Sequence, residues 1–386
     1  MIESRPSLVR NLRGLPGVLW FLLVGAFINR FGTFLLPFLV LYLTSRGFSE
    51  AQAGLALSAY GIGNFAASFI GGHLSDHIGR RNTIVISMLA SAVVVLALSQ
   101  AQSLALLIVL TLCAGAAADT FRPAAEALVV DLCTPEQQLT AAALYRFAAH
   151  LGFALGPIAA GLLVNRSYNL LFAADAASSV LFGLIALAFL PWGARHPAPE
   201  GKQGRWLTTA LSDWRFVRFL VASLAITTVT VQMDATLGLH ILRVGHSAST
   251  YGMLMSVNGA LIVLFEVSMT VVTQRFPQRT VMAVGYVMTA AGFALTAVAM
   301  SKLAIGLTIA LWTFGEMAFS PVANVHVAQL APPHLRGRYM GLFNASLAIS
   351  LILGPVIGTM TFAYSESLVW SGCGILGVAA AVLILI

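Results

Sequence analysis

Charged residues are scarce in this chain, and that scarcity limits what it can fold into more than any other feature. Asp, Glu, Lys and Arg make up 9% of the 386 residues, hydrophobic residues make up 59%, and the mean hydropathy is +0.89. A soluble domain carries about 25% charged residues, so an ordinary water-soluble protein is excluded and most of the surface must face lipid. About twelve spans of ~20 residues would account for the apolar part of the chain. The sequence therefore predicts an all-α polytopic membrane protein.

The apolar stretches between polar breaks predict six spans in each half of the chain. The twelve predicted spans are 17–43, 51–72, 83–98, 104–127, 141–164, 168–190, 215–240, 249–273, 280–300, 303–327, 338–362 and 368–386.

The distribution of basic residues predicts how the chain lies in the membrane. With a cytoplasmic N-terminus, fourteen of the 21 Lys and Arg residues fall in cytoplasmic segments, and three lie within spans. Only Arg46, Arg166, Arg243 and Lys302 fall on the outer side of the membrane. Cytoplasmic loops carry an excess of Lys and Arg, so we expect a multi-pass protein of the cell (inner) membrane with both termini in the cytoplasm. This placement also explains the net charge of +7 without a nucleic-acid partner. The fourteen residues are Arg5, Arg10, Arg13, Arg80, Arg81, Arg195, Lys202, Arg205, Arg215, Arg218, Arg275, Arg279, Arg336 and Arg338.

The longest polar break separates the two sets of spans. It runs from His196 to Asp213 and contains Pro197, Pro199 and Gly201. We interpret 196–213 as a cytoplasmic linker between an N-terminal six-helix bundle, 1–195, and a C-terminal six-helix bundle, 214–386.

The two halves repeat with an offset of 198 residues and without a gap. The matches include prolines, an arginine and a Gly-Pro pair, which chance matching of small residues in a biased composition does not explain. Six spans repeated in the same orientation indicate the parallel repeat of a two-bundle transporter. The matching pairs are Gly54 and Gly252, Ser58 and Ser256, Gly61 and Gly259, Arg81 and Arg279, Phe121 and Phe319, Pro123 and Pro321, Pro135 and Pro333, and Gly156-Pro157 and Gly354-Pro355.

A short loop between the second and third predicted spans carries a motif, GHLSDHIGRR, from Gly72 to Arg81. A loop this short must reverse two helices, so we expect Gly79 to adopt a backbone angle that other residues avoid. Asp76 can then face a basic group or the N-terminus of a helix. The motif resembles the loop signature of the major facilitator superfamily, a family of membrane transporters.

A second resemblance to this superfamily lies in the fifth span. The segment Gly152–Gly161, with Gly156 followed by Pro157, is similar to the Gly-Pro motif of the superfamily's drug/proton antiporters. Glycines let helices approach closely, and a proline frees a backbone carbonyl and allows bending. Because Gly354-Pro355 repeats the pair in the eleventh span, we expect both pairs to bend their helices or to pack them at the interface between the halves.

The chain also departs from the exporters of this superfamily. Their fourth span often carries Arg followed by Gln-Gly, whereas here Arg122 is followed by Pro123. The second-half counterpart of the loop motif, Gln274–Arg279, lacks the Asp and the Gly. The substrate class is what these departures leave open.

Three charged residues of the fourth span predict a polar face at bilayer depth. Asp119, Arg122 and Glu126 are spaced i, i+3 and i+7, so they lie on one face of the helix. A helix rises 1.5 Å per residue, which places Arg30 of the first span at about the level of Asp119. Ionisable residues at this depth are costly and mark functional sites by default.

The resemblance implies that the first, fourth, seventh and tenth helices line a central cavity. Arg30, Asp119 and Arg122 of the first half, with Asp234 and Glu316 of the second, would then face it. Movement of an arginine relative to Asp119 would change the proton affinity of that carboxylate and so couple proton binding to a conformational change. The alternative is a permanent Arg–Asp cluster that only holds helices together.

The resemblance also implies a charge network that shuts the cytoplasmic gate. Arg146 begins the fifth span, and Glu126 and Asp131 lie at the end of the fourth, so these groups could meet beside Asp76. Arg80 and Arg81 belong to the same loop. Asp76 could also face the N-terminus of the eleventh helix near Gly337.

No residue pattern indicates a cofactor or a metal. His150, His240 and His326 lie in or near spans without metal-ligand spacing, and the three cysteines show neither CxxC spacing nor a disulfide framework. We expect these residues to serve packing.

The sequence as a whole predicts a secondary transporter that works by alternating access. No ATP-binding P-loop pattern occurs, so an ion gradient must supply the energy, and proton-coupled export of small amphiphilic or hydrophobic compounds such as drugs is the function we expect, by a monomer. The alternatives are a symporter or uniporter for a sugar, metabolite or siderophore-like solute and, more remotely, a membrane enzyme or receptor. The chain shows no nucleophile–base arrangement and no sizeable soluble domain that would support an enzyme.

Overall fold

A computed structural model of the chain describes residues 14–191, 206–332 and 335–386, and every regular element in these ranges is a helix. The N-terminal half contains α2 (Gly17–Phe31), α3 (Leu35–Ser45), α4 (Glu50–Ile78), α5 (Arg80–Gln100), α6 (Leu104–Asp119), α7 (Phe121–Leu132), α8 (Pro135–Val164) and α9 (Tyr168–Phe189). The C-terminal half contains α10 (Trp206–Ser212), α11 (Trp214–Thr230), α12 (Gln232–Ala235), α13 (Leu237–Arg243), α14 (Ala248–Thr273), α15 (Gln278–Leu295), the 3-10 turn η1 (Thr296–Val298), α16 (Lys302–Leu330), α17 (Arg336–Tyr364) and α18 (Glu366–Leu385).

Twelve helical segments of the described chain are long and apolar enough to cross a membrane, one for each predicted span. The prediction of an all-α, twelve-span protein is therefore confirmed. Three spans are interrupted: the first consists of α2 and α3, the fourth of α6 and α7, and the seventh of α11 and α12. The breaks matter because two of them carry the charged residues of the candidate site.

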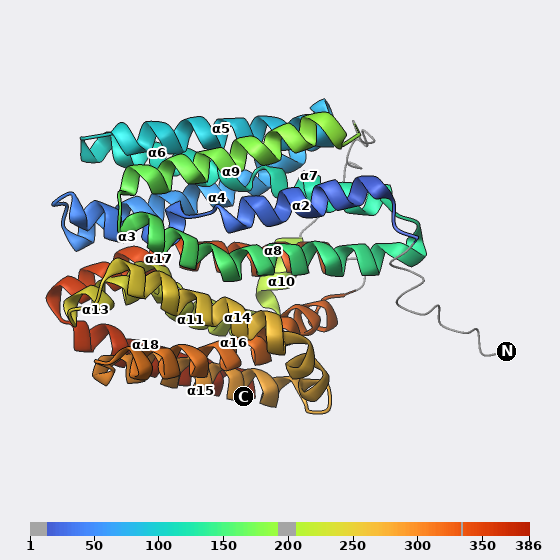
Figure 1. Ribbon diagram of the computed structural model, residues 1–386. Coiled ribbons are helices and arrows are strands. Elements are labelled where there is room, and N and C mark those ends of the chain that lie inside the picture. The colour runs from blue at the N-terminus through green and yellow to red at the C-terminus, as the bar shows by residue number, and fades with distance from the viewer. Residues whose placement is uncertain (1–13, 192–205, 333–334) are drawn as a thin grey trace.

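The two halves form two bundles that run side by side, as Figure 1 shows with the blue-to-green half above the yellow-to-red half. The repeat predicted from the sequence extends to the helix boundaries. Four second-half helices, α14, α15, α16 and α18, each begin 198 residues after their first-half counterparts α4, α5, α6 and α9. The turns that precede α4 and α14 use a glycine with positive φ at matching positions, Gly47 (87°) and Gly245 (89°). The parallel repeat is thus a property of the structure as well as of the sequence.

The predicted linker lies only partly within the described residues. Its portion 196–205 is outside them, and Trp206–Ser212 forms the short helix α10. The division into 1–195, 196–213 and 214–386 stays a prediction.

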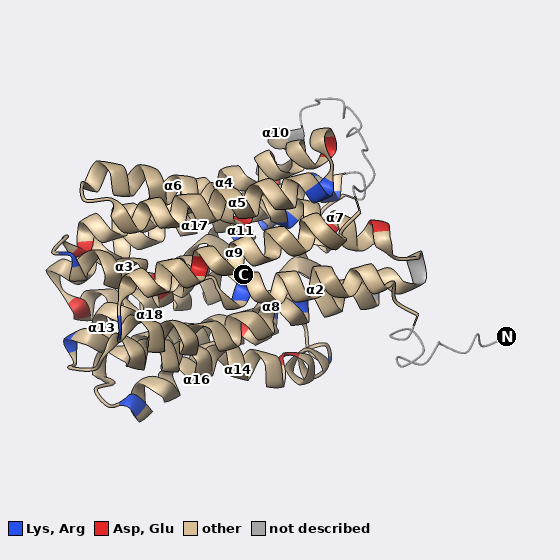
Figure 2. Ribbon diagram, turned by 45° about the horizontal axis from the view of Figure 1, so that its top comes forward, with Lys and Arg blue, Asp and Glu red and all other residues tan. Residues whose placement is uncertain are grey.

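The bundle has two ends, and we name them by where the described chain begins. The proximal end is where α2 and α5 begin and α4 ends, so it contains Arg80. The distal end is where α3 ends and α4 and α18 begin, so it contains Arg46 and Glu366. Figure 2 shows charged residues at both ends of the helices and a further set between the ends.

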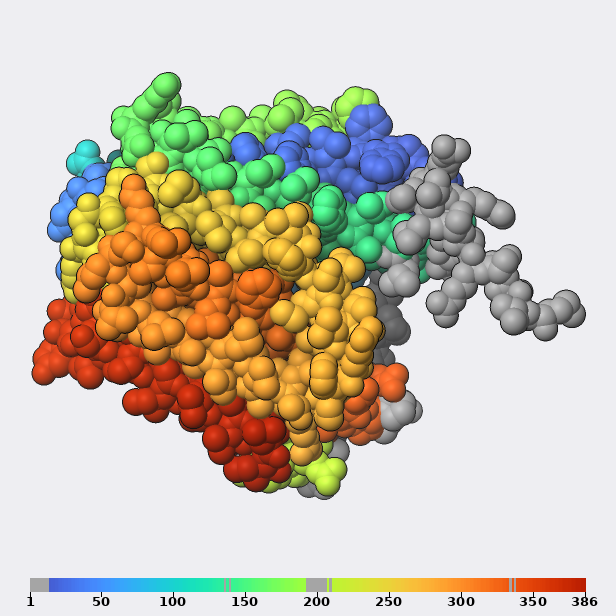
Figure 3. Space-filling view, turned by 60° about the horizontal axis from the view of Figure 1, so that its bottom comes forward, coloured from blue at the N-terminus to red at the C-terminus, as the bar shows by residue number. Residues whose placement is uncertain are grey.

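The halves touch each other at the distal end through paired helices. Helix α4 packs on α17, and α14 packs on α8. A Cβ placed on Gly54 would lie 2.9 Å from the Pro355 carbonyl oxygen, and one placed on Gly252 would lie 2.3 Å from the Pro157 carbonyl oxygen. Missing side chains let backbones approach this closely. Repeat-related glycines and prolines therefore build the distal seam, whose α8 and α14 side is visible in Figure 3 as the boundary between green and gold surfaces.

The Gly-Pro pairs contribute to packing on both sides of this seam. A Cβ on Gly156 would lie 2.7 Å from the Phe31 carbonyl oxygen, within the N-terminal half, and one on Gly354 would lie 3.1 Å from Val231, within the C-terminal half. Helices α8 and α17 continue through Pro157 and Pro355. The glycines of the two pairs thus pack within their own halves, and the prolines contact the other half through their carbonyl oxygens. Bending of the helices at these prolines stays a prediction.

Toward the proximal end, cavities separate the same helix pairs. The two halves are therefore in contact at the distal end and apart toward the proximal end.

Replacing Gly252 with valine should open the distal seam. Overpacking costs about 1–3 kcal/mol, so the ratio of closed to open molecules should fall by about fivefold or more. The measurement is the distance between spin labels on cysteines introduced at Gln102 and Leu303, which lie at the distal end of the two halves, in a background without the native cysteines. Gly372→Val is the matched control, because nothing lies within 4 Å of a Cβ at Gly372. An unchanged distance distribution in Gly252→Val would show that this contact does not hold the seam.

Candidate functional site

An ion pair at mid-depth joins the first and fourth spans. Arg30 Nη2 lies 3.1 Å from Asp119 Oδ1, and Arg122 Nη2 lies 3.7 Å from the same oxygen. Asn64 of α4 donates a hydrogen bond to the other carboxylate oxygen of Asp119. The side chain of Asp119 is 11% exposed and that of Arg30 is 21% exposed, whereas that of Arg122 is 51% exposed. The predicted common level of Arg30 and Asp119 is confirmed.

This cluster borders a cavity of about 580 Å³ between the halves, which we call the Asp119 cavity. Asp119, Arg122 and Glu126 all line it, as expected for residues on one face of the fourth span. Helix α17 of the other half supplies the opposite wall, so the cavity exists only where the halves separate. The other lining residues are Asn64, Phe65, Ser68, Phe69, Pro123, Gly341, Asn344, Ala345, Leu347, Ala348 and Leu351.

A second cavity, of about 470 Å³, lies on the other side of the interface, and we call it the Arg146 cavity. Arg146 Nη2 of α8 lies 3.4 Å from Glu266 Oε1 of α14, so an ion pair crosses between the halves here. The remaining wall is largely apolar, with His150 as another titratable group. The other lining residues are Ala143, Phe147, Ile262, Val263, Val267, Thr270, Val271, Gln274 and Pro321.

Glu316 and Asp234, the predicted cavity residues of the second half, line neither of these two cavities. Glu316 lies in α16 beside Asn258 and within electrostatic reach of both Glu266 and Asp234. Asn258 in turn donates a 3.1 Å hydrogen bond to Thr313. The second half therefore gathers three carboxyl groups near one another, and the structure pairs only Glu266 with a cation among the residues it describes.

The break in the first span is held by a buried carboxylate. Asp175 of α9 is 5% exposed and accepts hydrogen bonds from the backbone N–H groups of Phe34 and Leu35, each at 3.0 Å. These N–H groups open α3, where no helical carbonyl is available to accept from them. Asp175 and Arg30 also line a small polar cavity of about 20 Å³ inside the N-terminal bundle. This contact between α9 and the first span fixes the backbone just after Arg30.

The loop motif adopts the expected turn. Gly79 has φ of 85°, a backbone angle that favours glycine, so the sequence prediction is confirmed. Arg80 pairs with Asp131 at the end of α7 and donates a 2.5 Å hydrogen bond to the Ala127 carbonyl. Asp76 lies close enough to Arg80 to act on its charge. Arg80, Asp76 and Asp131 thus form a cluster that ties α4, α5 and α7 together.

The other members of the predicted gate lie elsewhere. Arg146 was expected to meet Glu126 and Asp131, but it pairs across the interface with Glu266, while Glu126 faces the Asp119 cavity. The reason is that α8 turns this part of its surface toward α14 of the other half. Gly72 borders open space on α4, and Arg81 follows Arg80 at the start of α5.

Sequence reasoning missed two members of the site. Asn64 was not singled out, although an amide in an apolar span is a signal of a polar partner. Glu266 was not singled out either, because nothing in its own span indicates that Arg146 is its partner. Both gain their role from a neighbouring helix that lies far away in the sequence.

A movement of the two halves that shifts these side chains would change how close Arg30 and Arg122 lie to Asp119. The Asp119 carboxylate has two cationic neighbours, one well buried and one half-exposed, and its proton affinity depends on how near they lie. Both cavities combine charged groups with apolar and aromatic walls, which suits amphiphilic molecules.

Comparison with known proteins places the chain in a family. A family model described as "Major Facilitator Superfamily" matches residues 22–245 and 215–386. Three relatives are Bacillus subtilis "Uncharacterized MFS-type transporter YqjV" (25% identity; 91% of this chain and 87% of that protein), Planococcus maritimus "Na(+), Li(+), K(+)/H(+) antiporter" (23%; 88% and 88%) and Aeromonas salmonicida "Multidrug resistance protein MdtH" (24%; 95% and 94%).

Among solved structures, the nucleoside transporter NupG (D323A mutant) is similar to this chain with a TM-score of 0.83 and 16% identity, over 96% of this chain and 99% of that one. At this identity the likeness shows a shared fold.

Removing the carboxyl group of Asp119 should destabilise the protein by about 3 kcal/mol. Loss of one partner of a buried ion pair costs about 3–5 kcal/mol because the other charge stays buried, and Asp119 borders a cavity, which favours the lower figure. We expect Asp119→Leu to lower the unfolding midpoint of the detergent-solubilised protein, and Arg30→Met/Asp119→Leu to regain most of the loss. Arg122→Gln, at a half-exposed partner, is the control and should have a small effect. Equal losses in the single and double variants would contradict the pairing.

Proposed function

Because the chain belongs to the Major Facilitator Superfamily and is a secondary transporter of that type, we propose that it exports small amphiphilic or hydrophobic compounds in exchange for protons. The observation that carries this proposal is the Asp119 cluster: a carboxylate at mid-depth with two arginine partners, on the wall of a cavity between the halves. Among the described residues of the N-terminal half, Asp119 is the carboxylate that combines a mid-depth position, two arginine partners and a place on the wall of this cavity.

The distribution of basic residues supports an orientation of the protein in the membrane. Arg80, Arg81 and Arg215 lie at the proximal end, in line with the basic bias of cytoplasmic segments. We take the proximal end to be cytoplasmic, with both termini on that side of the cell (inner) membrane. The closed distal seam and the two proximal cavities then correspond to an inward-facing conformation.

Coupling requires that proton binding and substrate binding favour different conformations. Arg30 is anchored within the N-terminal bundle beside the break that Asp175 holds, whereas Arg122 is half exposed to the cavity. A positively charged substrate, or a change in the position of Arg122, alters the charge around Asp119 without disrupting the buried pair. Glu316 of the second half, beside Asn258 and near two other carboxyl groups, is a second proton carrier.

The two cavities support the substrate class. Phe65, Phe69 and Leu351 line the Asp119 cavity beside its charges, and Phe147 and Val267 line the Arg146 cavity beside the Arg146–Glu266 pair. A molecule with an apolar body and a charged or polar group would contact both kinds of wall. The name of the relative MdtH, a multidrug resistance protein, agrees with such substrates.

Transport of other classes of molecule would be detected by the same proteoliposome assays. The relative named as a Na(+), Li(+), K(+)/H(+) antiporter suggests inorganic cations, and the fold shared with NupG suggests nucleosides. The Asp119 cluster favours the amphiphilic class over both, because its cavity has aromatic and leucine side chains beside the charges.

Proton movement that depends on substrate should disappear when the proposed carriers are neutralised. In proteoliposomes of the purified protein with an imposed pH gradient, adding a transported amphiphilic cation should release protons with the wild type. Asp119→Asn or Glu316→Gln should reduce this release at least about tenfold, while substrate counterflow persists. Lys302→Gln, at an exposed distal residue, is the control. Full proton release in both carboxylate variants would remove them as carriers.

Asp76→Asn should slow the transport cycle while leaving membrane insertion intact. Asp76 acts on Arg80 within the cluster that ties α4, α5 and α7 together, and loss of its charge weakens that cluster as the gate closes and opens. Substrate uptake rates of wild type and variant at matched amounts of inserted protein measure the effect. Normal uptake by a normally inserted variant would show that Asp76 has no part in gating.

A further inference from the structure

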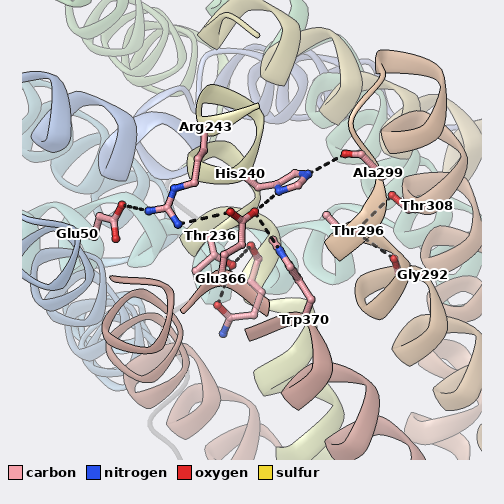
Figure 4. A network of polar contacts seen from close by, with 11 residues as sticks. Glu50, Thr236, His240, Arg243, Gly292, Thr296, Ala299, Thr308, Glu366 and Trp370 are labelled. Carbon is pink, nitrogen blue, oxygen red and sulfur yellow. Dashed lines mark hydrogen bonds and ion pairs between the residues drawn. The ribbon is translucent and has the colours of Figure 1, made fainter. Parts of the chain in front are cut away.

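A polar network at the distal end joins three helix ends and both halves of the protein (Figure 4). Arg243, in the last turn of α13, lies 2.8 Å from Glu50 Oε1 at the start of α4 and 3.4 Å from Glu366 Oε2 at the start of α18. Its guanidinium also stacks on the Phe362 ring, 4.1 Å from the centroid. Glu50 belongs to the N-terminal half and Arg243 to the C-terminal half, so this pair crosses the distal seam.

The same network contains a buried histidine on the carboxylate. His240 Nδ1 contacts Glu366 Oε1, and His240 Nε2 lies 3.0 Å from the Ala299 carbonyl oxygen. The His240 side chain is 1% exposed and that of Glu366 is 22% exposed. Trp370 Nε1 donates to the same Glu366 oxygen at 3.4 Å.

The two contacts of the His240 ring limit where its hydrogens can lie. A carbonyl oxygen only accepts hydrogen bonds, so Nε2 of His240 must carry a hydrogen. In neutral histidine only one ring nitrogen does, which would leave a lone pair of Nδ1 against an ionised carboxylate. A hydrogen bond between His240 and Glu366 therefore needs one more proton, either on Nδ1 or on the carboxyl group.

The proton sets the charge balance of the whole network. With it, the His240–Glu366 pair has no net charge, and Arg243 balances Glu50. Without it, two carboxylates, Glu366 and Glu50, compete for Arg243 alone. Because Glu366 lies on the same half as Arg243, loss of the proton draws Arg243 toward Glu366 and weakens the contact with Glu50 across the seam.

The internal repeat shows that packing alone does not require these titratable groups. The positions of the N-terminal half that correspond to His240, Glu366 and Ala299 are Tyr42, Tyr168 and Ala101. The Tyr42 and Tyr168 rings pack against each other with centroids 5.3 Å apart. Two tyrosines thus fill the place that a histidine and a glutamate fill in the other half, where the acid–base pair sits beside the ion pair across the seam.

We propose that His240 and Glu366 form a proton-binding site that closes the distal end when it takes up one proton. Uptake neutralises Glu366 through His240 and leaves Arg243 to bridge to Glu50; release opens the seam. With the distal end outside the cell, protons from outside would drive the transporter toward its inward-facing conformation. This direction rests on the proposed function, whereas the link between proton and seam does not.

The elements packed against α13 and α18 carry further charged or titratable groups. They are Asp234 on α12, Tyr251 on α14, Tyr286 on α15, Tyr364 at the end of α17, and Tyr42 on α3 with Arg46 just after it, while Lys302 begins α16 beyond Ala299. Arg46 donates to the Tyr42 hydroxyl at 2.7 Å, and Tyr251 donates to the Met233 carbonyl at 3.2 Å, so both have their own partners.

The first test measures the distal seam as a function of pH, without substrate. In the full-length protein labelled at Gln102 and Leu303, the ratio of open to closed molecules should rise by about fivefold or more between pH 5 and pH 8. Transplanting the first-half pair, as His240→Tyr/Glu366→Tyr, should keep the protein folded and reduce that change to less than about twofold. An unchanged pH response in the transplant would overturn the proposal.

Two single variants separate the parts of the network. Glu50→Gln should raise the open fraction at pH 5, because it removes the partner across the seam and leaves the His240–Glu366 pair in place. His246→Gln is the matched histidine control: His246 Nε2 lies 3.0 Å from the Met300 carbonyl, and among the described residues it pairs with no carboxylate. It should respond to pH as the wild type does. A loss of the response in His246→Gln as large as in the transplant would also overturn the assignment.

The second test locates the proton directly. Nitrogen-15 NMR of histidine-labelled protein at pH 5, with His240→Gln to assign the signals, reports whether Nδ1 of His240 carries a hydrogen, and carbon-13 shifts of labelled Glu366 report protonation of its carboxyl group. We expect a proton on one of the two while the distal labels show the closed state. A closed seam with neither group protonated would contradict the proposal. Because neither test needs transport, a failure of export and a failure of this site are distinguishable.

Discussion

A charge in the low-dielectric interior of a membrane protein must be paired or neutralised, and the Arg30–Asp119 pair meets that requirement at the centre of this structure. It ties the first span to the fourth, and Asn64 adds a tie to the second. The break after Arg30, capped by Asp175, shapes the backbone that presents it. Asp119 places this pair at the wall of the cavity between the halves, and the proposed exchange of protons depends on it.

The scaffold is symmetric, whereas the chemistry is not. Repeat-related glycines and prolines build two equivalent contacts across the distal seam. At the positions that correspond to Arg30, Asp119 and Arg122 the second half carries Thr228, Met317 and Ser320. Conversely, its distal acid–base pair stands where the first half has two tyrosines. The symmetry thus supplies equivalent contacts between the halves, and the charged groups that differ between the halves supply the proposed sites for protons.

Hydropathy and spacing predicted the fold well, because both follow from the chain itself. Span number, the parallel repeat and the turn at Gly79 depend on local sequence, and the common level of Arg30 and Asp119 follows from the helical rise. The partners of Arg146 and Asp131 could not be predicted in the same way. Every face of these helices is apolar enough to pack, so the sequence does not say which helix meets which. Contacts across the seam, such as Arg146 with Glu266 and Arg243 with Glu50, also depend on the conformation of the whole protein.

The central claim is that the halves rock about the membrane midplane so that one end closes as the other opens. Distances measured at both ends of the same protein test it most directly, with the distal labels at Gln102 and Leu303 and, in a parallel sample, proximal labels at His77 and Phe276. The account predicts opposite changes: conditions that lengthen the distal distance shorten the proximal one. Distances that change together, or a proximal distance that stays fixed while the distal one lengthens, would contradict it.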